Sequence, residues 1–517
     1  MKLVTPKEIQ AAEKKAFTKK DSQFKAIEQA GLIVAQETWV NGNLDNTLSI
    51  LAIIGPGNNG SDGLVAARIL SSWKIKVTLV LLKKRDDLKE FLRNEINNIQ
   101  FFIPKDKSSF IKMNKLISSH ECIIDGLFGI GWDIHRKKTR LNQIADEIIK
   151  QININNNYIV SIDIPSGIDP ETGQAQLNTI QADLTITFGA MKIGMTQQPA
   201  SSLAGKIIIE DTQIAKYLKH PSYAETIDID NELLKKIIRN SNANKGDFGK
   251  LLVIAGSRTY PGAAIMTCEA ASIAGTGIIS LLSNKFVQQT AMITNPEVTL
   301  MDVGDKNEID KKYLPTIFNQ LGNFDAIVIG PGLSQSKKTV FFITKIITQL
   351  QNLKNSPPIV IDADGLNILS KMKKWPFKLS KKIILTPHPG EMARIMQTTT
   401  QKIQKNRINY AIQLNEQSKA TIVLKGPGTI IASRNSLKIS NYSLPALASP
   451  GTGDILTGLI GGLLAQGLEP IEATSLAVHF HALAGKELEN NIGPISAKAS
   501  DLFIYLPKII TQLTKQV

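Results

Sequence analysis

The stretch of this chain best suited to chemistry is Gly451-Thr452-Gly453-Asp454, which precedes the apolar run 455–460. Small residues before a helix-like pattern let backbone N–H groups point into one hollow at a helix N-terminus, where the helix dipole favours an anion. A carboxylate at the mouth of that hollow can accept a proton from a bound hydroxyl group. We therefore predict a phosphate-handling site with Asp454 as its base, although a glycine-rich turn with Asp454 as an ordinary N-cap fits these residues equally well.

A second glycine-rich loop follows the apolar run 49–54, which is typical of a buried parallel strand. Residues 55–63 read Gly-Pro-Gly-Asn-Asn-Gly-Ser-Asp-Gly and lead into a helical pattern over 64–73. Strand, glycine-rich loop and helix follow in this order in phosphate-binding α/β folds, although the spacing is not the GxGxxG of dinucleotide-binding proteins. The two asparagine side chains suit a monovalent cation or a ribose, and the alternative is a simple tight turn.

Two further strands of the first half end in acidic, glycine-containing loops. The apolar run 121–124 precedes Asp125, and the run 158–162 precedes Asp163 and, three residues later, Ser166. The carboxyl ends of parallel strands meet at one edge of a sheet, which is where ligands bind in open α/β folds. A single aspartate in such a loop is more often a helix cap than a catalyst, but three converging loops favour a site.

The second half alternates in the same style but repeats no motif of the first. Predicted strands cover residues 250–255, 278–282, 325–329, 359–361, 382–385 and 421–424. Their loops again combine glycine, proline and acid, as in Gly-Pro-Gly at 330–332, Asp-Ala-Asp at 362–364, Thr-Pro-His-Pro-Gly-Glu at 386–391 and Lys-Gly-Pro-Gly-Thr at 425–429. We interpret His388, which lies between two prolines, as a binding residue, with capping of the next helix as the alternative.

The domain organisation follows from length and pattern. A chain of 517 residues is too long for one typical domain. The pattern weakens over residues 213–244, where we place a linker at 219–240 between domains 1–218 and 241–517. Alternating strands and helices in both domains predict the α/β class, with parallel sheets flanked by helices. Apolar strands and helices in both halves leave room for self-association, and we expect a homo-oligomer.

Composition argues against several classes of protein. Cys122 and Cys268 form no CxxC pair, which argues against a zinc site and fits a reducing compartment. The N-terminus lacks a signal-peptide pattern and no apolar run is long enough to span a bilayer, so we expect a cytoplasmic protein without a membrane partner. The net charge of +15 comes from scattered residues, which favours a polyanionic small molecule over nucleic acid.

The motifs of both halves resemble known families. Gly-Pro-Gly-Thr at 426–429 and Gly-Thr-Gly-Asp at 451–454 resemble the ribokinase-like superfamily. The match narrows to the ADP-dependent NAD(P)H-hydrate dehydratases with the motifs at 245–249, 256–257, 362–364 and 386–391. The first half resembles the NAD(P)H-hydrate epimerases through its loops at 55–62, 125–129 and 163–169. The order matches the fused bacterial nicotinamide-nucleotide repair enzymes and implies a Rossmann-like three-layer domain followed by a ribokinase-like α/β domain.

The epimerase resemblance implies inversion between the S and R forms of the hydrated nucleotides NADHX and NADPHX. Asp163 would contact the damaged ring as an acid–base group, and a potassium ion would bind Asn59, Asp125 and Ser166. The residues implied to hold the dinucleotide are Asn58, Asn59, Gly60, Ser61, Asp62, Gly129, Ile130, Gly131, Trp132, Asp133, Ile134 and His135. Ser61 and Ile130 stand where the family usually has Gly and Thr. The Cβ of Ser61 would crowd a backbone contact unless its hydroxyl adds one, and Ile130 lacks a hydroxyl near the pyrophosphate.

The dehydratase resemblance implies that the S hydrate is dehydrated at the expense of ADP, with AMP and phosphate as products. Asp454 would deprotonate the ring hydroxyl for attack on the β-phosphoryl group, and magnesium would sit at the nucleotide phosphates. The implied substrate residues are Ala263, Gly332, His388 and Asp454, and the implied nucleotide residues are Lys425, Gly426, Pro427, Gly428, Thr429 and Gly453. The preference for NADHX or NADPHX, and for ADP or ATP, is left open.

Two other functions fit parts of the chain. The second half alone permits a ribokinase-like small-molecule kinase with an N-terminal nucleotide-binding module. The first half alone permits a non-catalytic module of the kind that scaffolds RNA metabolism. The presence of Asn59, Asp125, Asp163 and Ser166 argues against a degenerate first site.

Overall fold

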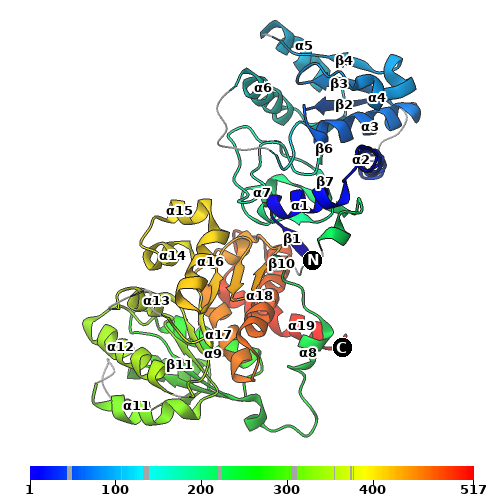
Figure 1. Cartoon of the computed structure of the whole chain (residues 1–517). Coiled ribbons are helices and arrows are strands. Elements are labelled where there is room, and N and C mark those ends of the chain that lie inside the picture. Colours follow the sequence, from blue (N-terminus) through cyan, green and yellow to red (C-terminus); the bar gives the residue numbers. More distant parts are fainter. Residues whose placement is uncertain are drawn as a thin grey trace. The chain divides into compact units, whose positions relative to one another are not determined.

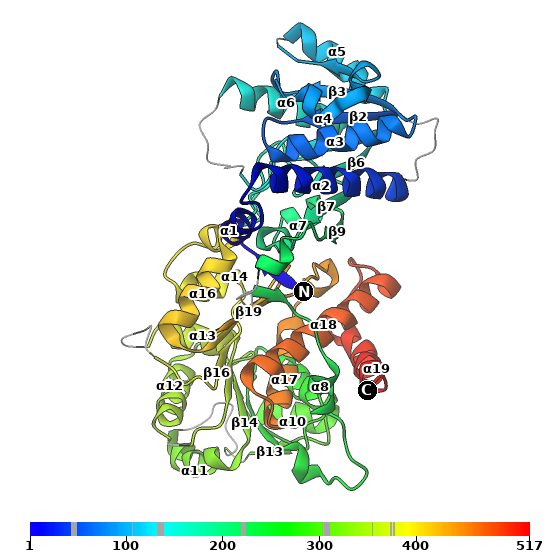
Figure 2. The same ribbon diagram turned by 45° about the vertical axis from the view of Figure 1, so that its right-hand side comes forward.

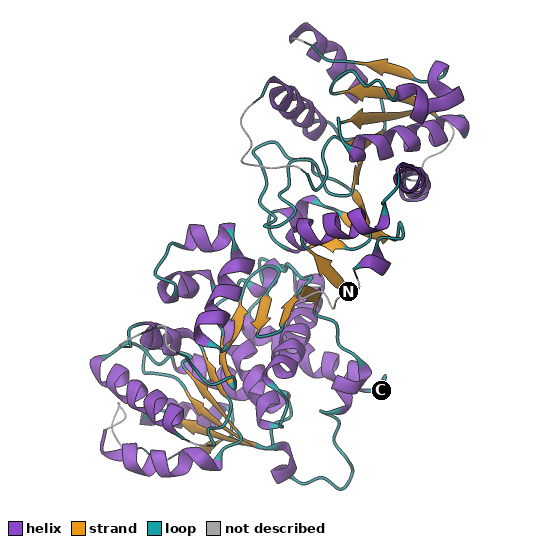
Figure 3. Ribbon diagram, in the orientation of Figure 1, coloured by secondary structure: helices purple, strands orange, loops and turns teal. Residues whose placement is uncertain are grey.

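The computed structural model describes residues 1–42, 49–105, 107–131, 139–218, 224–301, 303, 311–353, 355–372, 375 and 378–517. The chain forms two compact units, Lys2–Ala224 and Glu225–Val517, with Met1 grouped with the second (Figure 1). Each unit is a parallel sheet covered by helices, which confirms the predicted α/β class (Figure 3). No described helix has the length and apolar character needed to cross a membrane.

The sheet of the first unit runs in the order β4-β3-β2-β5-β6-β7-β9, and its neighbouring strands are parallel. The strands are β2 (Ser49–Ile54), β3 (Lys76–Leu81), β4 (Gln100–Phe102), β5 (Cys122–Gly126), β6 (Tyr158–Ile162), β7 (Leu184–Phe188) and β9 (Lys206–Glu210). Every residue of β2 is buried, as its continuous apolar sequence predicts.

Helices cover both faces of this sheet. Alternate residues of β2 point to opposite sides, so Ile50 and Ile54 pack with one helical layer while Leu51 and Ile53 pack with the other. The first layer contains α2 (Lys20–Asn41) and α3 (Asn58–Ser72), and the second contains α5 (Lys107–Ser118) and α6 (Arg140–Ile154) (Figure 2). This is the three-layer arrangement expected for the first half.

Short elements complete the first unit near the carboxyl edge of its sheet. The strand β1 (Lys2–Val4) pairs in parallel with β8 (Met191–Lys192), and it leads directly into α1 (Pro6–Ala16). A capping box at Thr5 starts this helix, because Thr5 Oγ1 accepts from the Glu8 backbone while Glu8 Oε2 accepts from the Thr5 backbone. The remaining helices are α4 (Leu88–Leu92) and α7 (Ala200–Leu203).

The sheet of the second unit includes the run β13-β12-β11-β14-β15-β16-β17-β18-β19, which is parallel up to β17 and antiparallel over its last two pairings. The strands are β10 (Ala224–Thr226), β11 (Lys250–Ile254), β12 (Ile278–Leu282), β13 (Thr299–Leu300), β14 (Ala326–Ile329), β15 (Ile359–Ile361), β16 (Ile383–Leu385), β17 (Thr421–Leu424), β18 (Ile430–Ser433) and β19 (Ser436–Ile439). The hairpin of β18 and β19 was not predicted from the sequence.

Helices also cover both faces of the second sheet, with α12 and α16 on one side and α17 and α18 on the other (Figure 2). The core beneath the second group joins Leu251, Val328 and Val360 of the strands to Ile455 and Leu459 of α17. The helices are α8 (Asn231–Lys235), α9 (Pro261–Ile273), α10 (Lys285–Thr294), α11 (Leu314–Gln320), α12 (Lys337–Asn352), α13 (Ala363–Ser370), α14 (Pro389–Ile395), α15 (Thr400–Lys405), α16 (Arg407–Ser418), α17 (Thr452–Ala465), α18 (Pro470–Ile492) and α19 (Leu502–Thr514).

Candidate functional sites

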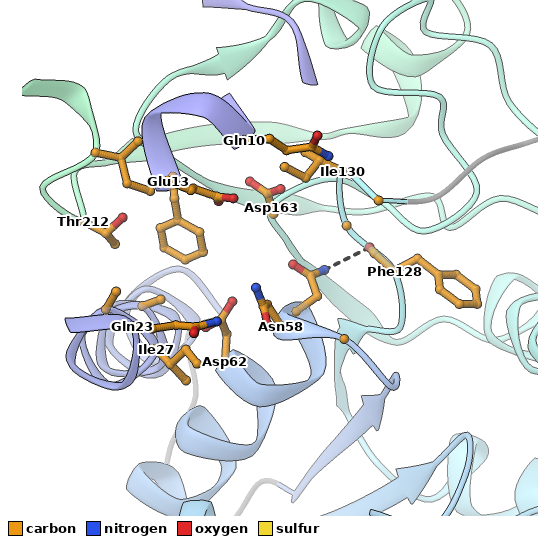
Figure 4. A pocket seen from close by; sticks show the side chains of 18 of the residues that line it. Gln10, Glu13, Gln23, Ile27, Asn58, Asp62, Phe128, Ile130, Asp163 and Thr212 are labelled. Atoms are coloured by element: carbon orange, nitrogen blue, oxygen red, sulfur yellow. Dashed lines mark hydrogen bonds between the residues drawn. The ribbon is translucent and has the colours of Figure 1, made fainter. Parts of the chain in front are cut away.

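A cavity of about 640 Å³ lies in the first unit, at the loops that follow β2, β5 and β6. Predicted residues line its wall, namely Asn58, Asn59, Asp62, Gly129, Ile130, Gly131 and Asp163 (Figure 4). Gly60 and Ser61 belong to the first turn of α3 but are not part of the lining. Trp132, Asp133, Ile134 and His135 lie outside the described residues. The structure thus brings the segments that follow these three strands together around one cavity.

Arg85, which the sequence motifs did not reveal, holds the loop of residues 55–57 and the first turn of α3. The guanidinium donates to the Gly55 carbonyl at 2.7 Å and to Ser61 Oγ at 2.7 Å. The hydroxyl of Ser61 therefore makes a contact with Arg85 that a glycine at this position would lack. The preceding residue must be small, because a Cβ on Gly60 would lie 2.2 Å from the Gly55 carbonyl oxygen.

Asp125, Ser166 and Asn59, the three residues implied to bind a cation, lie in one hydrogen-bonded cluster. Ser166 donates to Asp125 from its hydroxyl at 2.6 Å and from its backbone at 2.9 Å. Asn59 Nδ2 donates to the carbonyls of Ile162, at 2.7 Å, and of Phe128, at 2.9 Å. Burial raises the pKa of Asp125, and the hydrogen bonds from Ser166 oppose that rise.

The donor set of this cluster fits a hard cation. Because Asn59 uses its amide nitrogen on the two carbonyls, its Oδ1 faces Gly129, where an added Cβ would lie 2.9 Å from that oxygen. The Phe128 carbonyl and the oxygens of Asp125 and Ser166 are joined in the same network. Carbonyl, carboxylate and hydroxyl oxygens are the ligands that hard metal ions prefer.

Asp163 lies on the cavity wall and is paired with Lys192, which sequence reasoning also missed. The Lys192 ammonium donates to Asp163 Oδ1, to Thr187 Oγ1 at 2.8 Å and to the Phe188 carbonyl at 3.1 Å. The lysine side chain is 1% exposed, so this ion pair is buried on its cationic side. Asp163 also has a φ of +68°, which is uncommon for a residue with a Cβ and marks a backbone held in place by its surroundings.

Two further carboxyl groups, from Glu13 and Asp62, face the same cavity (Figure 4). Burial raises the pKa of Asp62 well above its ordinary value, the charges of Asp163 and Glu13 add to the rise, and Arg85 opposes it. Burial also raises the pKa of Glu13, again with help from Asp163 and against Lys192. The cavity therefore combines one ionised pair with two carboxyl groups that bind a proton more readily than usual.

In the second unit, the helix α17 begins at the predicted Gly-Thr-Gly-Asp loop. Gly451 is its N-cap with a φ of +98°, and a Cβ there would lie 2.6 Å from Met266 Sδ, so only glycine fits. Thr452 Oγ1 donates to the carbonyls of Leu447, at 2.8 Å, and Ser449, at 3.0 Å. Asp454 lies in the first turn, three residues after the N-cap, so it is not the N-cap itself, which was the alternative weighed for it.

Lys425 lies between Asp362, which follows β15, and Gly453, in the first turn of α17. Its ammonium donates to Asp362 Oδ1 at 2.6 Å, and an added Cβ on Gly453 would lie 3.3 Å from it. Asp362 Oδ2 accepts from Thr457 of α17 at 2.7 Å. Burial, helped by the charge of Asp362 and opposed by Lys425, raises the pKa of Asp454 to about 7. A carboxyl with that pKa can accept a proton near neutral pH and is suited to a general base.

Two of the implied substrate residues, Ala263 and Gly332, lie near the backbone of Asp454. Thr267 Oγ1 donates to the Ala263 carbonyl at 2.8 Å and lies 3.3 Å from the Asp454 carbonyl. A Cβ on Gly332 would lie 2.7 Å from the Ala263 Cβ, so these two backbones approach closely. Ala263, Gly332 and Asp454 are therefore near neighbours.

His388 caps α14, which was the alternative weighed for it. Its Nδ1 accepts from the Gly390 backbone at 3.0 Å, and its backbone N–H donates to Glu391 Oε2 at 2.8 Å. The same Glu391 oxygen lies 4.0 Å from Lys425 Nζ, which connects the cap to the site. Burial and the charge of Lys425 lower the pKa of His388, so the imidazole is neutral at pH 7. Because the ring is half exposed, capping does not prevent it from contacting a ligand.

Arg407, a third residue that the sequence did not reveal, holds the loop of residues 425–429. It is buried and donates to the carbonyls of Leu424 at 3.3 Å and Lys425 at 3.4 Å. Gly426 and Gly428, with φ of +128° and +60°, give this loop its shape. Burial lowers the pKa of Arg407 to about 10, so the guanidinium stays charged at neutral pH.

Comparisons with known proteins match both units. A family model described as NAD(P)H-hydrate dehydratase matches residues 251–508, and one described as YjeF-related protein N-terminus matches residues 25–194. A bifunctional NAD(P)H-hydrate repair enzyme of Moorella thermoacetica is 30% identical over 503 residues, covering 95% of this chain and 93% of that protein. The Escherichia coli protein of the same description is 31% identical and covers 89% and 84%. The ADP/ATP-dependent NAD(P)H-hydrate dehydratase of Bacillus subtilis, co-crystallised with ATP and Mg²⁺, is 27% identical, with a TM-score of 0.46, and covers 55% of this chain and 97% of that one.

Proposed function

We infer the function from the premise that this chain belongs to the family of bifunctional NAD(P)H-hydrate repair enzymes. We propose that the unit Lys2–Ala224 interconverts the S and R hydrates of NADH and NADPH, and that the unit Glu225–Val517 dehydrates the S form at the expense of ADP. The observation that carries this proposal is that each unit places a buried lysine–aspartate pair among the loops at the carboxyl edge of its sheet.

For the epimerase, the proposed reaction is inversion at the hydrated ring carbon, C6. Asp163 accepts a proton from the water that re-adds to the ring, and Lys192 pairs with this carboxyl and fixes its direction. Potassium at Asn59, Asp125 and Ser166 would supply a local positive charge for the dinucleotide. The hydrogen bonds described above orient the oxygens of those three residues, of which Asn59 also lines the cavity.

For the dehydratase, Asp454 takes the proton of the ring hydroxyl, whose oxygen then attacks the β-phosphoryl group of ADP. Backbone N–H groups of the loop 451–453 and the Lys425 ammonium stabilise charge on that group. Magnesium would accompany the nucleotide held by residues 425–429 and would supply positive charge that offsets the charge of the phosphate groups. Among the described residues, no group of three or more acidic, histidine or cysteine side chains could hold a metal ion by itself.

The proposed function is tested by incubating the protein with both hydrate epimers and either ADP or ATP. We expect both epimers to disappear, with reduced nicotinamide, AMP and phosphate accumulating when ADP is supplied. A small-molecule kinase would instead accumulate a phosphorylated product, and a non-catalytic first unit would leave the R epimer unconsumed beyond its uncatalysed exchange. Titration with RNA, as a separate measurement, tests the nucleic-acid alternative. The self-association expected from the sequence is measured by light scattering.

The pH dependence of dehydration should follow Asp454. The base must be ionised, so kcat/KM is expected to fall about tenfold per pH unit below pH 7 and to level off above it. Burial also raises the pKa of Glu391 to about 7, so the pH profile of Glu391→Gln must be measured beside it. If the pH profile of Glu391→Gln keeps its midpoint near pH 7, Asp454 is the group that titrates. If the midpoint disappears in this variant, Glu391 is the group that titrates.

Replacing Arg85 with methionine should weaken binding of the hydrate to the first unit. The segment 55–61 loses two hydrogen bonds from a charged donor, each worth about 1.5–3 kcal/mol, so the KM for epimer exchange is expected to rise at least about tenfold. Arg93→Met is the matched control, because Arg93 is half exposed and pairs with Glu28 at the surface. Equal KM values in both variants would contradict the role of Arg85.

A further inference from the structure

The helix α1 presents one side chain to the epimerase cavity that the proposed mechanism has not used. Gln10, Glu13 and the C-cap residue Phe17 are spaced three and four residues apart, so they lie on one face of α1. All three line the cavity. Figure 4 shows the carboxyl groups of Glu13 and Asp163 directed toward the same space. Glu13 also precedes residue 25, where the matched family segment begins.

The fold fixes the position of Glu13 relative to Lys192. The adjoining side of α1 is buried through Ile9 and Ala12, which belong to the same apolar cluster as Val4 and Ile214. The strand β1, directly before α1, pairs with β8 so that Val4 lies opposite Lys192 itself. The capping box at Thr5 stops the helix from fraying at this end. The same short segment therefore anchors the lysine strand and the helix that carries Glu13.

The charges around Lys192 are unbalanced. One ammonium faces the carboxyl groups of both Asp163 and Glu13, but its hydrogen bonds go to Asp163, Thr187 and Phe188. Among the described residues, Glu13 forms no side-chain ion pair or hydrogen bond. Because the lysine is held by Asp163, Glu13 is left without a cationic partner of its own. Burial and the charge of Asp163 raise the pKa of Glu13, and Lys192 opposes the rise. Glu13 is therefore the carboxyl group of the two that is better suited to carry a proton to the substrate.

We propose that Glu13 is a second catalytic carboxyl group of the epimerase site, which donates a proton to the hydroxyl leaving C6 while Asp163 accepts a proton from the incoming water. This inference rests on the proposed epimerase function.

The C6–O bond breaks as the Glu13 proton reaches the hydroxyl, which leaves as water with its bonding electron pair, and the ring becomes an iminium ion with an N1–C6 double bond. Water then adds to the other face of C6 and gives one proton to Asp163. The two carboxyl groups have exchanged a single proton, and no other reactant is consumed. The reverse reaction uses the same groups with their roles exchanged, as an isomerisation with two similar ground states requires.

The test is the full-length Glu13→Gln variant, assayed by chromatography of the separated S and R hydrates, with the exchange rate without enzyme subtracted. We expect kcat for epimer exchange to fall about 100-fold with KM changed less than about threefold, because the amide keeps the size of the side chain but carries no acidic proton. ADP-dependent dehydration of the pure S hydrate should stay at the wild-type rate, because that reaction belongs to the unit Glu225–Val517. Unchanged urea unfolding of the variant shows that the first unit is folded. Glu90→Gln is the matched control, since Glu90 is exposed and lies outside the cavity.

A purely structural role is distinguished by rescue. Glu13→Asp should recover part of the lost kcat, and formate should accelerate Glu13→Ala but not the wild type. Wild-type exchange in Glu13→Gln would overturn the assignment, and so would a loss that neither Glu13→Asp nor formate restores. If the wild-type protein itself does not accelerate exchange, the proposed epimerase function fails instead, so the two failures are separate observations.

Discussion

Replacing Asp454 with asparagine is expected to lower ADP-dependent dehydration about 1000-fold and to leave epimer exchange unchanged. The variant keeps the size of the side chain but removes the group that accepts the hydroxyl proton, a contribution typically worth ~10²–10⁴-fold. The carboxyl is suited to that task because burial, with Asp362 beside it, raises its pKa to about 7. The measurement is recovery of reduced-nicotinamide absorbance from the S hydrate with saturating ADP.

The stability of this variant should rise slightly, which separates catalysis from folding. A carboxyl whose pKa is raised in the folded state binds protons more tightly there, so its contribution to stability is present below its unfolded pKa of ~4 and is lost as the pH rises through 7. Asparagine carries no charge, and at pH 8 the free energy of unfolding of Asp454→Asn should not fall below that of the wild type. Glu416→Gln, at an exposed position of α16, is the control. A fully active, folded Asp454→Asn would refute the base.

Replacing Asp163 is expected to abolish epimer exchange, but the choice of substitution decides whether the protein folds. Alanine would leave the ammonium of Lys192 buried without its carboxylate, and breaking such a pair costs about 3–5 kcal/mol. Asp163→Asn keeps a hydrogen-bond acceptor for the lysine, and we expect it to fold and to exchange epimers about 1000-fold more slowly.

A double variant separates the two roles of this pair. Asp163→Asn combined with Lys192→Met removes both charges, so its free energy of unfolding should exceed that of Lys192→Met alone. Epimer exchange should stay as low as in Asp163→Asn. The measurements are urea unfolding and chromatography of the hydrates. Wild-type exchange in Asp163→Asn would exclude this carboxyl as a proton carrier, whatever the stabilities are.

The sequence predicted those parts of the two sites that are local in the chain. The strands β2, β5 and β6 and the loops after them follow from continuous apolar runs ending in glycine or aspartate. The start of α17 was predicted from Gly451 to Asp454 in the same way. Loop geometry depends on a few neighbouring residues, and so it can be read from spacing.

The charged partners of these loops could not be predicted, because tertiary folding alone selects them. Lys192 follows Asp163 by 29 residues and Arg407 precedes Lys425 by 18, with no fixed spacing linking either pair. Lys192 could have been singled out in the sequence, because it is the sole lysine in the stretch 184–199. No such feature of the sequence distinguishes Arg85 or Glu13. The hydroxyl contact of Ser61 likewise depends on Arg85. The sequence alone therefore could not decide between a clash of the Ser61 Cβ and a contact of its hydroxyl.

The pairing of β1 with β8 has a practical consequence for work with shortened proteins. A fragment cut to the matched segment 25–194 would lose β1 and α1, and with them one wall of the cavity. It would also uncover the apolar side chains of Ala190 and Met191, which invites aggregation. An affinity tag fused directly before Met1 would lie next to the strand that anchors this wall. Activity measured on such a fragment would describe an open pocket and not the native enzyme.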